Sequence, residues 1–560
     1  MEFEERADQL STEEISTSLA DGEILKKARQ KLLATGAKLL IGPRGTGKTH
    51  LMRYIYSQSL LNKSSPLVLY SSFNRYLHLE PLLKKTPDAL KRFHSWVLAR
   101  ILLSAFDYIN DLSSSGDFLK DLDPIYDEQK LRELISLLER GSGVELYESF
   151  GQFLTVDHVI RAVRSLNARF NRNRAVLLLD DAALSLSDQY LVAFFEIFRV
   201  LKVEGIAPKA SVYPGTTQYG PTFHASHEVE EVPLWLSVED PAYSTIMGDI
   251  ANRRLSSDQQ KSISPDILEL FKYTAFGIPR VFLRLLREFF SERAGTSQSK
   301  VNKIIDQQVE LIGAEYDSIA LKLKQFSSVI QIGRSFFSNA VMEVSTLQNK
   351  DLSRRNIVLG ILQSGDRTLL ADRMIKFLIE VGMIFPLQSV SHGQNRKYDR
   401  YIPHLAFLYQ SGAFKEGKRN TFRGLSELMM ATPAKHPLRR EFKSLLSSRE
   451  LADLKLDLPP CKKCGTQRFN DSQQFCHNCG EPLVGSSLFE ECMKLPLSEV
   501  PGISETLIGR IHQDTNIRSV SDVVISQNAS SELQKANYVG PRRAENIIRK
   551  VELTVEEFLS

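Results

Sequence analysis

Residues 42–49 combine glycines, a lysine and a threonine at a spacing suited to phosphate binding. The glycines allow the backbone to fold around a phosphate group with its N–H groups pointing inward. Lys48 is placed to reach the β- and γ-phosphates of a nucleotide, and the Thr49 hydroxyl to bind Mg²⁺. The segment therefore predicts a site for ATP or ADP with Mg²⁺, formed by Gly42, Pro43, Arg44, Gly45, Thr46, Gly47, Lys48 and Thr49.

A second chemical feature is the carboxylate pair Asp180 and Asp181, which follows an apolar run over residues 175–179. A buried strand places such carboxylates at the carboxyl edge of a parallel sheet, where α/β proteins bind their ligands. We expect Asp180 to hold the Mg²⁺ ion and Asp181 to orient or deprotonate the attacking water. The alternative is that the two residues only cap the next helix.

Cysteines supply a third feature, because four of the five lie within 19 positions. They form two Cys-x-x-Cys pairs separated by eleven residues, and a glycine follows each pair: Cys461, Cys464, Cys476 and Cys479. Four thiolates at this spacing suit tetrahedral Zn²⁺ in a closed, structural site. The unit is too small for a core of its own, so we expect it to lose its fold under chelators.

The phosphate-binding segment needs a strand before it and a helix after it. Residues 38–41 predict a short buried strand after a helical pattern at 25–33, and residues 51–60 predict a helix. A helix amino terminus directs its N–H groups and its dipole at a bound anion. This setting favours a nucleotide site over a glycine-rich turn with a chance lysine.

Together with a strand at 210–218 and the segment Gly277-Ile-Pro-Arg280 that opens a helix, these motifs resemble the AAA+ superfamily, nearest to the origin-recognition type of initiator ATPase. The resemblance implies that Arg280 is sensor 2, which touches the γ-phosphate from a helical lid. A bidentate arginine can couple nucleotide state to lid angle. The alternative for Arg280 is a solvated residue of the first helical turn. Sensor 1 would be a polar residue of the strand end, Thr216, Thr217 or Gln218. The alternative for Thr217 is a plain strand-end hydroxyl.

Three features depart from the family pattern. Lys48 and Asp180 are 132 residues apart, so a helical insertion is predicted at about residues 86–170. Asp181 stands where most active AAA+ enzymes have a glutamate, which is one methylene longer, and slow hydrolysis is expected. The Asp-Asp pair and the Gly-Ile-Pro segment also resemble the STAND signalling ATPases, so the choice between the two groups stays open.

Beyond the lid, a helical pattern near 374–384 precedes two strand patterns that flank the turn at 391–395. This order resembles a winged helix, with the turn as its wing tip. Residues 371–443 contain 13 Lys or Arg and 6 Asp or Glu, which suits a surface facing DNA phosphates, Arg396 and Lys397 included. A protein-binding winged helix is the alternative.

The carboxyl-terminal part contains two related segments 36 residues apart, at 500–508 and 537–544. Both resemble the helix-hairpin-helix signature, although Ser504 replaces one glycine of the first copy and Tyr538 one glycine of the second. In that family, backbone N–H groups of the hairpin bind DNA phosphate without reading bases. The implied DNA contacts are Gly502, Gly540, Arg542 and Arg543. Residues 461–560 hold 11 basic and 13 acidic residues, so binding would be local, and a protein-interaction role is the alternative.

Composition limits the remaining choices. The chain has 560 residues, a length that predicts several globular domains. Its net charge of +4 does not by itself indicate a polyanionic partner. No apolar run approaches 18 residues, and the acidic start does not resemble a secretory signal, so we expect an intracellular (cytoplasmic) protein that does not contact membranes. The sequence shows no metal-binding cluster of carboxylates apart from Asp180 and Asp181, and no further helicase motifs. These observations disfavour a nuclease or a helicase.

We therefore predict a multidomain α/β protein built on a P-loop AAA+ parallel-sheet core. The predicted domains are an ATPase core (1–240), a helical lid (241–325), a winged helix (326–445), a linker with a zinc ribbon (446–485) and an all-α tandem helix-hairpin-helix domain (486–560). The predicted function is ATP-dependent binding of duplex or branched DNA, independent of its sequence, as a loading or recruiting factor. Homo-oligomers are expected, since AAA+ subunits usually supply arginine fingers to their neighbours. The alternative is a STAND-type signalling ATPase, for example in antiviral defence, that senses DNA or a partner and activates an effector nuclease or helicase.

Overall fold

The computed structural model describes the chain except for residues 1–6, 8, 21, 75–78, 80–86, 113, 115–116, 141–143, 182–187, 218, 220–222, 224, 292–295, 364–366, 394–395, 417–418, 421, 459, 462, 467–472, 474, 482, 484–492, 525, 527 and 560. The chain divides into two compact units. The first contains Met1–Val68, Lys209–Thr217 and Val229–Asp457, and the second contains Leu69–Pro208, Gln218–Glu228 and Leu458–Ser560.

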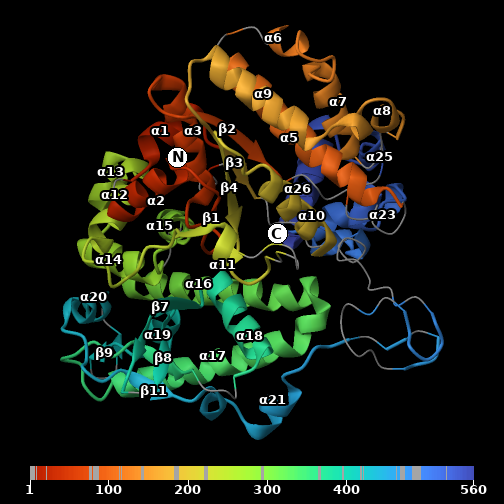
Figure 1. Ribbon diagram of the computed structural model, residues 1–560. Coiled ribbons are helices and arrows are strands. Elements are labelled where there is room, and N and C mark those ends of the chain that lie inside the picture. Colours follow the sequence, from red (N-terminus) through yellow and green to blue (C-terminus); the bar gives the residue numbers. More distant parts are fainter. Residues whose placement is uncertain are drawn as a thin grey trace. The chain divides into compact units, whose positions relative to one another are not determined.

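Five short strands form one sheet in the order β2-β3-β4-β1-β5 (Figure 1). They are β1 (Lys38–Ile41), β2 (Leu67–Ser72), β3 (Ala175–Asp180), β4 (Ile206–Val212) and β5 (Glu230–Pro233). Strand β1 runs parallel to both β4 and β5, with Leu39 opposite Ala210 and Glu231. All residues of β3 and β4 are buried, as expected for strands of an α/β sheet. The predicted α/β fold class with a parallel-sheet core is confirmed.

The predicted strand at 210–218 ends earlier than expected. Strand β4 stops at Val212, and Thr216 and Thr217 lie in the turn after it. Pro214 and Gly215 explain the early end, because proline lacks the N–H that a strand donates and both residues favour turns. Gln218, the third sensor candidate, lies outside the described residues.

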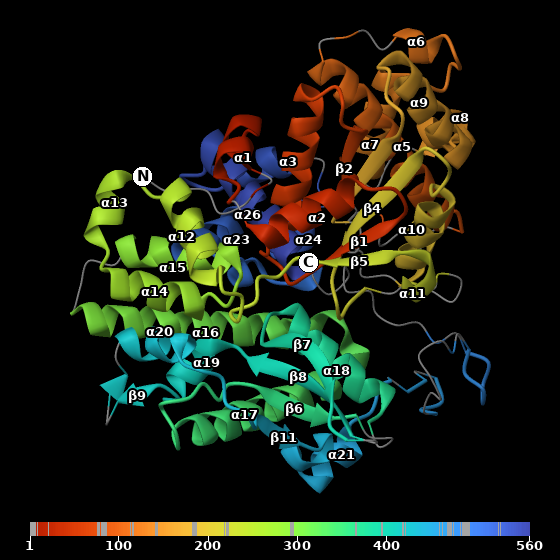
Figure 2. The same ribbon diagram turned by 60° about the vertical axis from the view of Figure 1, so that its left-hand side comes forward.

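Helices of the first unit flank the phosphate-binding segment and build the region after β5 (Figures 1 and 2). The amino-terminal ones are α1 (Thr12–Ser18), α2 (Glu23–Leu33) and α3 (Lys48–Leu61). After β5 come α12 (Tyr243–Arg254), α13 (Ser257–Ser262), α14 (Pro265–Thr274), α15 (Pro279–Ser291) and α16 (Ser297–Lys322). Serines or threonines cap α13, α14 and α16, and the carboxylate of Glu14 completes a capping box with Ser11 at α1.

The long helix α17 (Ser327–Gln348) lies beside α16 and packs against a four-stranded sheet with the order β11-β6-β8-β7 (Figure 2). The strands are β6 (Leu359–Leu362), β7 (Ile384–Ser391), β8 (Lys397–Pro403) and β11 (Leu438–Arg440), and β9 (Lys415–Glu416) pairs with β10 (Arg419–Asn420). The helices are α18 (Leu369–Glu380), α19 (Leu405–Gln410), α20 (Phe422–Met430) and α21 (Ser448–Asp453). Helix α18 followed by the antiparallel pair β7–β8 has the predicted order of helix, strand, turn and strand. The winged-helix assignment itself stays a prediction.

In the second unit, the chain between β2 and β3 is helical, as the periodicity predicts. It contains α5 (Ala89–Asp111), α6 (Asp117–Lys120), α7 (Glu128–Leu138), α8 (Val144–Ser149) and α9 (Val156–Arg169), and α10 (Asp188–Val200) and α11 (Ala225–Glu228) follow β3. The carboxyl-terminal helices are α23 (Glu505–Asp514), α24 (Val520–Val524), α25 (Ala529–Leu533) and α26 (Pro541–Leu559). They share a core of their own, from Met493 to Val555. Among the described residues, no helix is long and apolar enough to span a membrane.

Candidate nucleotide site and metal centre

The predicted phosphate-binding segment, residues 42–49, forms a tight loop between β1 and α3. Gly45 and Gly47 adopt positive φ angles of 85° and 93°, which are strained for residues with a Cβ. A Cβ at Gly42 would lie 2.6 Å from the carbonyl oxygen of Leu234, so this position also requires glycine. The Thr46 hydroxyl donates a hydrogen bond to the Pro43 carbonyl oxygen at 3.0 Å and closes the loop. The backbone therefore fits the cradle that phosphate binding needs.

Lys48 is buried and lies over this loop. Its ammonium donates hydrogen bonds to the carbonyl oxygens of Gly42 at 2.6 Å and Pro43 at 3.0 Å. It also lies 4.2 Å from the ring centroid of Tyr213, a cation–π contact with the residue that follows β4. These contacts hold a positive charge at the loop, where a phosphate oxygen can replace the carbonyl oxygens as its acceptor.

Arg280 is the second residue of α15 and lies against the same loop. Its backbone N–H donates to the Gly45 carbonyl oxygen at 3.3 Å. A Cβ at Gly45 would lie 2.8 Å from the Arg280 Cβ, so the arginine passes directly over the loop backbone. Gly277, three residues earlier, has φ 74°, and a Cβ there would lie 2.0 Å from the Leu236 carbonyl oxygen. The Gly-Ile-Pro-Arg segment thus has the local shape that brings Arg280 to the phosphate-binding loop.

The turn after β4 is bound to α18 by one carboxylate. Glu380 Oε2 accepts hydrogen bonds from the backbone N–H groups of Gly215 at 2.6 Å and Thr216 at 2.7 Å, and Oε1 accepts from the Thr216 hydroxyl at 2.8 Å. Burial raises the pKa of Glu380, although these hydrogen bonds act in the opposite direction. The Thr217 hydroxyl instead accepts from the Tyr213 N–H at 3.0 Å and shapes the turn internally. The Thr216 side chain is thus committed to Glu380 and that of Thr217 to the turn itself.

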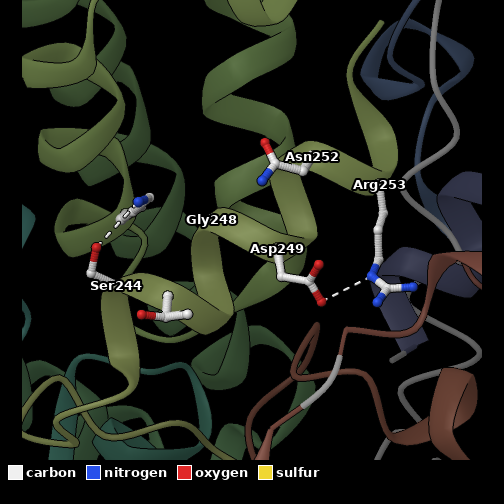
Figure 3. Close-up of a pocket in the computed structure, with 7 residues that line it drawn as sticks. Ser244, Gly248, Asp249, Asn252 and Arg253 are labelled. Carbon is white, nitrogen blue, oxygen red and sulfur yellow. Dashed lines mark hydrogen bonds and ion pairs between the residues drawn. The ribbon is translucent and has the colours of Figure 1, made fainter. Parts of the chain in front are cut away.

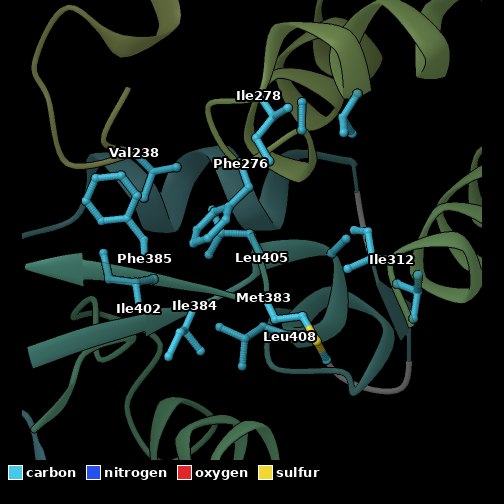
Figure 4. Packing of buried hydrophobic residues seen from close by; sticks show 14 of the residues in the cluster. Val238, Phe276, Ile278, Ile312, Met383, Ile384, Phe385, Ile402, Leu405 and Leu408 are labelled. Atoms are coloured by element: carbon cyan, nitrogen blue, oxygen red, sulfur yellow. The ribbon is translucent and has the colours of Figure 1, made fainter. Parts of the chain in front are cut away.

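Apolar packing connects the segment before α15 to the β7–β8 region. Phe276 and Ile278 belong to the same buried cluster as Phe385, Ile402 and residues of α19 (Figure 4). The rings of Phe276 and His404 lie 4.6 Å apart, and the Trp235 indole N–H donates to the Phe276 carbonyl oxygen at 2.8 Å. A shared core of this kind transmits displacement, because close-packed interiors deform little.

Asp180 and Asp181 belong to the second unit. Asp180 is fully buried, and its Oδ2 accepts a hydrogen bond from the Tyr70 hydroxyl of β2 at 3.0 Å. Its carbonyl oxygen accepts from the Phe73 N–H at 3.0 Å, which fixes the strand end. Asp181 has φ 52°, in the left-handed region that aspartate tolerates better than most residues. Asp180 thus ends β3 as predicted, and the backbone turns sharply at Asp181.

A polar pocket lies on α12 and α14 and contains none of the predicted site residues (Figure 3). Arg253 donates from Nε to the Asp249 carboxylate at 2.9 Å and from Nη1 to the Thr17 carbonyl oxygen at 3.0 Å. Lys272 is paired with Glu269 and contacts the Ser244 hydroxyl at 3.2 Å. The pocket is therefore lined by side chains that are largely paired with one another.

The four predicted zinc ligands converge. Their sulfur atoms all lie within 4.8 Å of one another: Cys461, Cys464, Cys476 and Cys479. The N–H of Gly465 donates to the Cys461 carbonyl oxygen at 2.8 Å, and that of Gly480 to the Cys476 carbonyl oxygen at 2.9 Å. Both glycines have positive φ, 70° and 68°, so the two knuckles have matching turns. The donor set fits a tetrahedral Zn²⁺ site, whose chemistry would be structural.

The two predicted hairpins also have matching backbones. Gly502 has φ 80°, and Tyr538, at the equivalent position 36 residues later, has φ 67°. Each hairpin leads into a helix, α23 after Ser504 and α26 after Gly540. Arg542 and Arg543 are exposed on α26, and Arg396 and Lys397 are exposed near the β7–β8 turn, where residues 394–395 lie outside the described residues.

The sequence did not predict three residues that contact individual candidate site residues or the turn after β4. The ring of Tyr213 makes a cation–π contact with the Lys48 ammonium, and the Tyr70 hydroxyl donates a hydrogen bond to Asp180. The Glu380 carboxylate accepts hydrogen bonds from the turn after β4. None of them stands in a recognisable motif. Only the run Tyr213-Pro214-Gly215, which predicts a turn, gave a weak signal.

Comparison with known proteins gives one family match. Residues 3–198, about a third of the chain, match the family model described as ORC-CDC6-like. No curated protein sequence matches the chain.

Among solved structures, the matches include the ORC1 protein of Aeropyrum pernix in complex with DNA, at 14% identity and a TM-score of 0.32, covering 71% of this chain and 93% of that one. A Walker-type ATPase of Pyrococcus abyssi matches at 12% identity and a TM-score of 0.35, with coverage of 70% and 94%. The Aeropyrum pernix ORC2 protein in ADPNP-ADP complexes matches at 12% and 0.30, with coverage of 73% and 94%.

Proposed function

We propose that the chain, whose residues 3–198 match the ORC-CDC6-like family model, is a DNA-binding AAA+ ATPase whose bound nucleotide sets its affinity for DNA. In this proposal the loop at 42–49 holds the phosphates of ATP or ADP, with Lys48 and Arg280 neutralising their charge. Thr49 and Asp180 would hold Mg²⁺, which would stabilise the negative charge of the phosphates during transfer. Asp181 orients water, and its short side chain is the reason to expect slow turnover.

One observation carries the proposal of a switch: Glu380 binds the turn after β4 to α18. The turn follows Tyr213, which contacts Lys48, and α18 precedes the β7–β8 pair with its exposed basic residues. A change in the phosphate contacts of Lys48 can therefore alter the position of the turn and, through Glu380, that of α18. Hydrogen bonds to a charged acceptor are strong enough to transmit such a change.

The test is an equilibrium binding comparison of the full chain on duplex, forked and single-stranded DNA, with ATP, ADP or no nucleotide. We expect DNA affinity to differ by about 5- to 150-fold between ATP and ADP, the usual range of allosteric coupling. Equal affinity in all nucleotide states, or no DNA binding, would contradict the proposal. Tightly retained ADP with almost no turnover would favour the STAND-type alternative.

The carboxyl-terminal contribution is tested separately, by truncation before Glu481. Loss of the hairpins should weaken DNA binding and reduce the slope of affinity against salt, since fewer phosphate contacts release fewer ions. Unchanged binding would assign DNA contact to the β7–β8 region with Arg396 and Lys397.

A further inference from the structure

The second hairpin carries an exposed aromatic residue in an unusual backbone conformation. Tyr538 has φ 67°, a region that bulky side chains rarely adopt. Its side chain nevertheless stays 75% exposed, so burial of the ring does not compensate for the strain. Strain that persists although the ring is mostly exposed points to a role for the side chain itself.

The surroundings of Tyr538 hold it in place. The guanidinium of Arg510 on α23 lies 4.8 Å from the ring centroid, and Nη1 of Arg543 donates to the Tyr538 carbonyl oxygen at 2.8 Å. The neighbouring Asn537 N–H donates to Asp514 at 2.8 Å. The ring is thus exposed but pre-ordered, which lowers the entropy lost when a ligand stacks on it.

The first hairpin differs at the equivalent place. Gly502 has no ring, and its carbonyl oxygen accepts a hydrogen bond from Lys550 of α26. A Cβ at Gly502 would lie 3.2 Å from the Lys550 ammonium, so that surface is already covered. Only the second hairpin presents an aromatic surface beside exposed cations.

We propose that Tyr538 is a stacking site for an unpaired nucleobase, with Arg542 and Arg543 on the adjacent phosphates. The inference rests on the proposed DNA binding and narrows it to DNA that contains an unpaired base. Bases inside a duplex present their edges but not their faces, whereas an unpaired base can stack on an aromatic ring. Because every base has such a face, the site selects DNA structure and not sequence.

The experiment measures affinity of the full chain for three DNAs: a duplex, the same duplex with one unpaired adenine, and the same duplex with an abasic residue at that position. The abasic DNA keeps the bulged backbone but has no base to stack. We expect the unpaired adenine to bind about 5- to 150-fold more tightly than the abasic residue, the range of base–aromatic stacking. A fluorescent adenine analogue at the bulge should be quenched on binding.

Two kinds of variant separate stacking from folding. Tyr538→Gly removes the ring and tolerates positive φ, so it should fold and lose the preference, while Tyr538→Phe should keep it. Arg542→Ala should weaken binding of all three DNAs alike, because it removes a phosphate contact. If the wild type does not distinguish adenine from the abasic residue, or Tyr538→Gly keeps the preference, the stacking site is refuted and the proposed DNA binding stands. If the wild type binds none of the DNAs, both fail.

Discussion

Replacing Glu380 tests the connection between the nucleotide loop and α18. Glu380→Ala leaves three donors without their acceptor: two backbone N–H groups and the Thr216 hydroxyl. A lost hydrogen bond to a charged group costs about 1.5–3 kcal/mol. Glu380 is only partly buried, so water can replace some of these bonds, and we take about 1 kcal/mol for each. The expected loss of unfolding free energy is therefore about 3 kcal/mol.

That energy is as large as typical coupling energies between sites, about 1–3 kcal/mol. Glu380→Ala should therefore also bring the ratio of DNA affinities in ATP and ADP close to one. Urea denaturation measures the first effect, and DNA titration with each nucleotide measures the second. Glu380→Gln keeps the size and one acceptor oxygen, so it should show a smaller effect on both.

Asp372 provides a matched control on the same helix. Its carboxylate is 43% exposed and pairs with Arg367, a mostly buried guanidinium that also pairs with Asp399 at 2.7 Å. Arg367 keeps this second partner in Asp372→Ala, so the variant should cost about 1 kcal/mol and leave the nucleotide ratio unchanged. If Glu380→Ala matched Asp372→Ala in both stability and nucleotide ratio, the carboxylate would not connect the two regions and the reasoning would be wrong.

Three further predictions concern other parts of the chain. Lys48→Ala should abolish ATP binding measured by calorimetry, whereas Lys38→Ala, which removes a strand lysine paired with Glu230, should leave it intact; tight ATP binding by the first variant would exclude the phosphate-loop assignment. Burial lowers the pKa of His404 to about 3, so below pH 6.5 the unfolded chain binds a proton that the folded chain does not. As the pH is lowered from 6.5 to 3, the unfolding free energy should therefore fall by up to about 1.4 kcal/mol per pH unit. The fall should be less steep in His404→Asn, which keeps an acceptor for the Ala406 N–H. Identical slopes of unfolding free energy against pH in urea titrations of the two proteins would refute this. Cys461→Ser or Cys479→Ser should remove one zinc per chain by metal analysis without changing ATP affinity, and a wild type free of zinc would contradict the site.

The candidate motifs could be predicted because each is built from short segments whose residues are neighbours in the sequence. The glycines and Lys48 occupy one turn between a strand and a helix, so local backbone preferences alone define the loop. The cysteine pairs and their following glycines likewise specify two knuckles, which the structure brings together. The 36-residue offset of the hairpins predicted that Tyr538 is equivalent to Gly502, and its φ of 67° agrees.

The sequence by itself thus determined the tight loop at 42–49, the two cysteine knuckles and the succession of helices and strands, since these depend on neighbouring residues. Tertiary structure alone decided that Tyr213 lies on Lys48, that Tyr70 binds Asp180, and that Glu380 holds a turn 164 residues away in the chain. Such contacts depend on how separate elements pack, and a single glutamate at the end of a helix has no sequence pattern that reveals its partner. The early end of β4 has a local cause in Pro214 and Gly215. The hydrogen bond from the Thr216 hydroxyl to Glu380 has no local cause, because it depends on the packing of α18 against the turn.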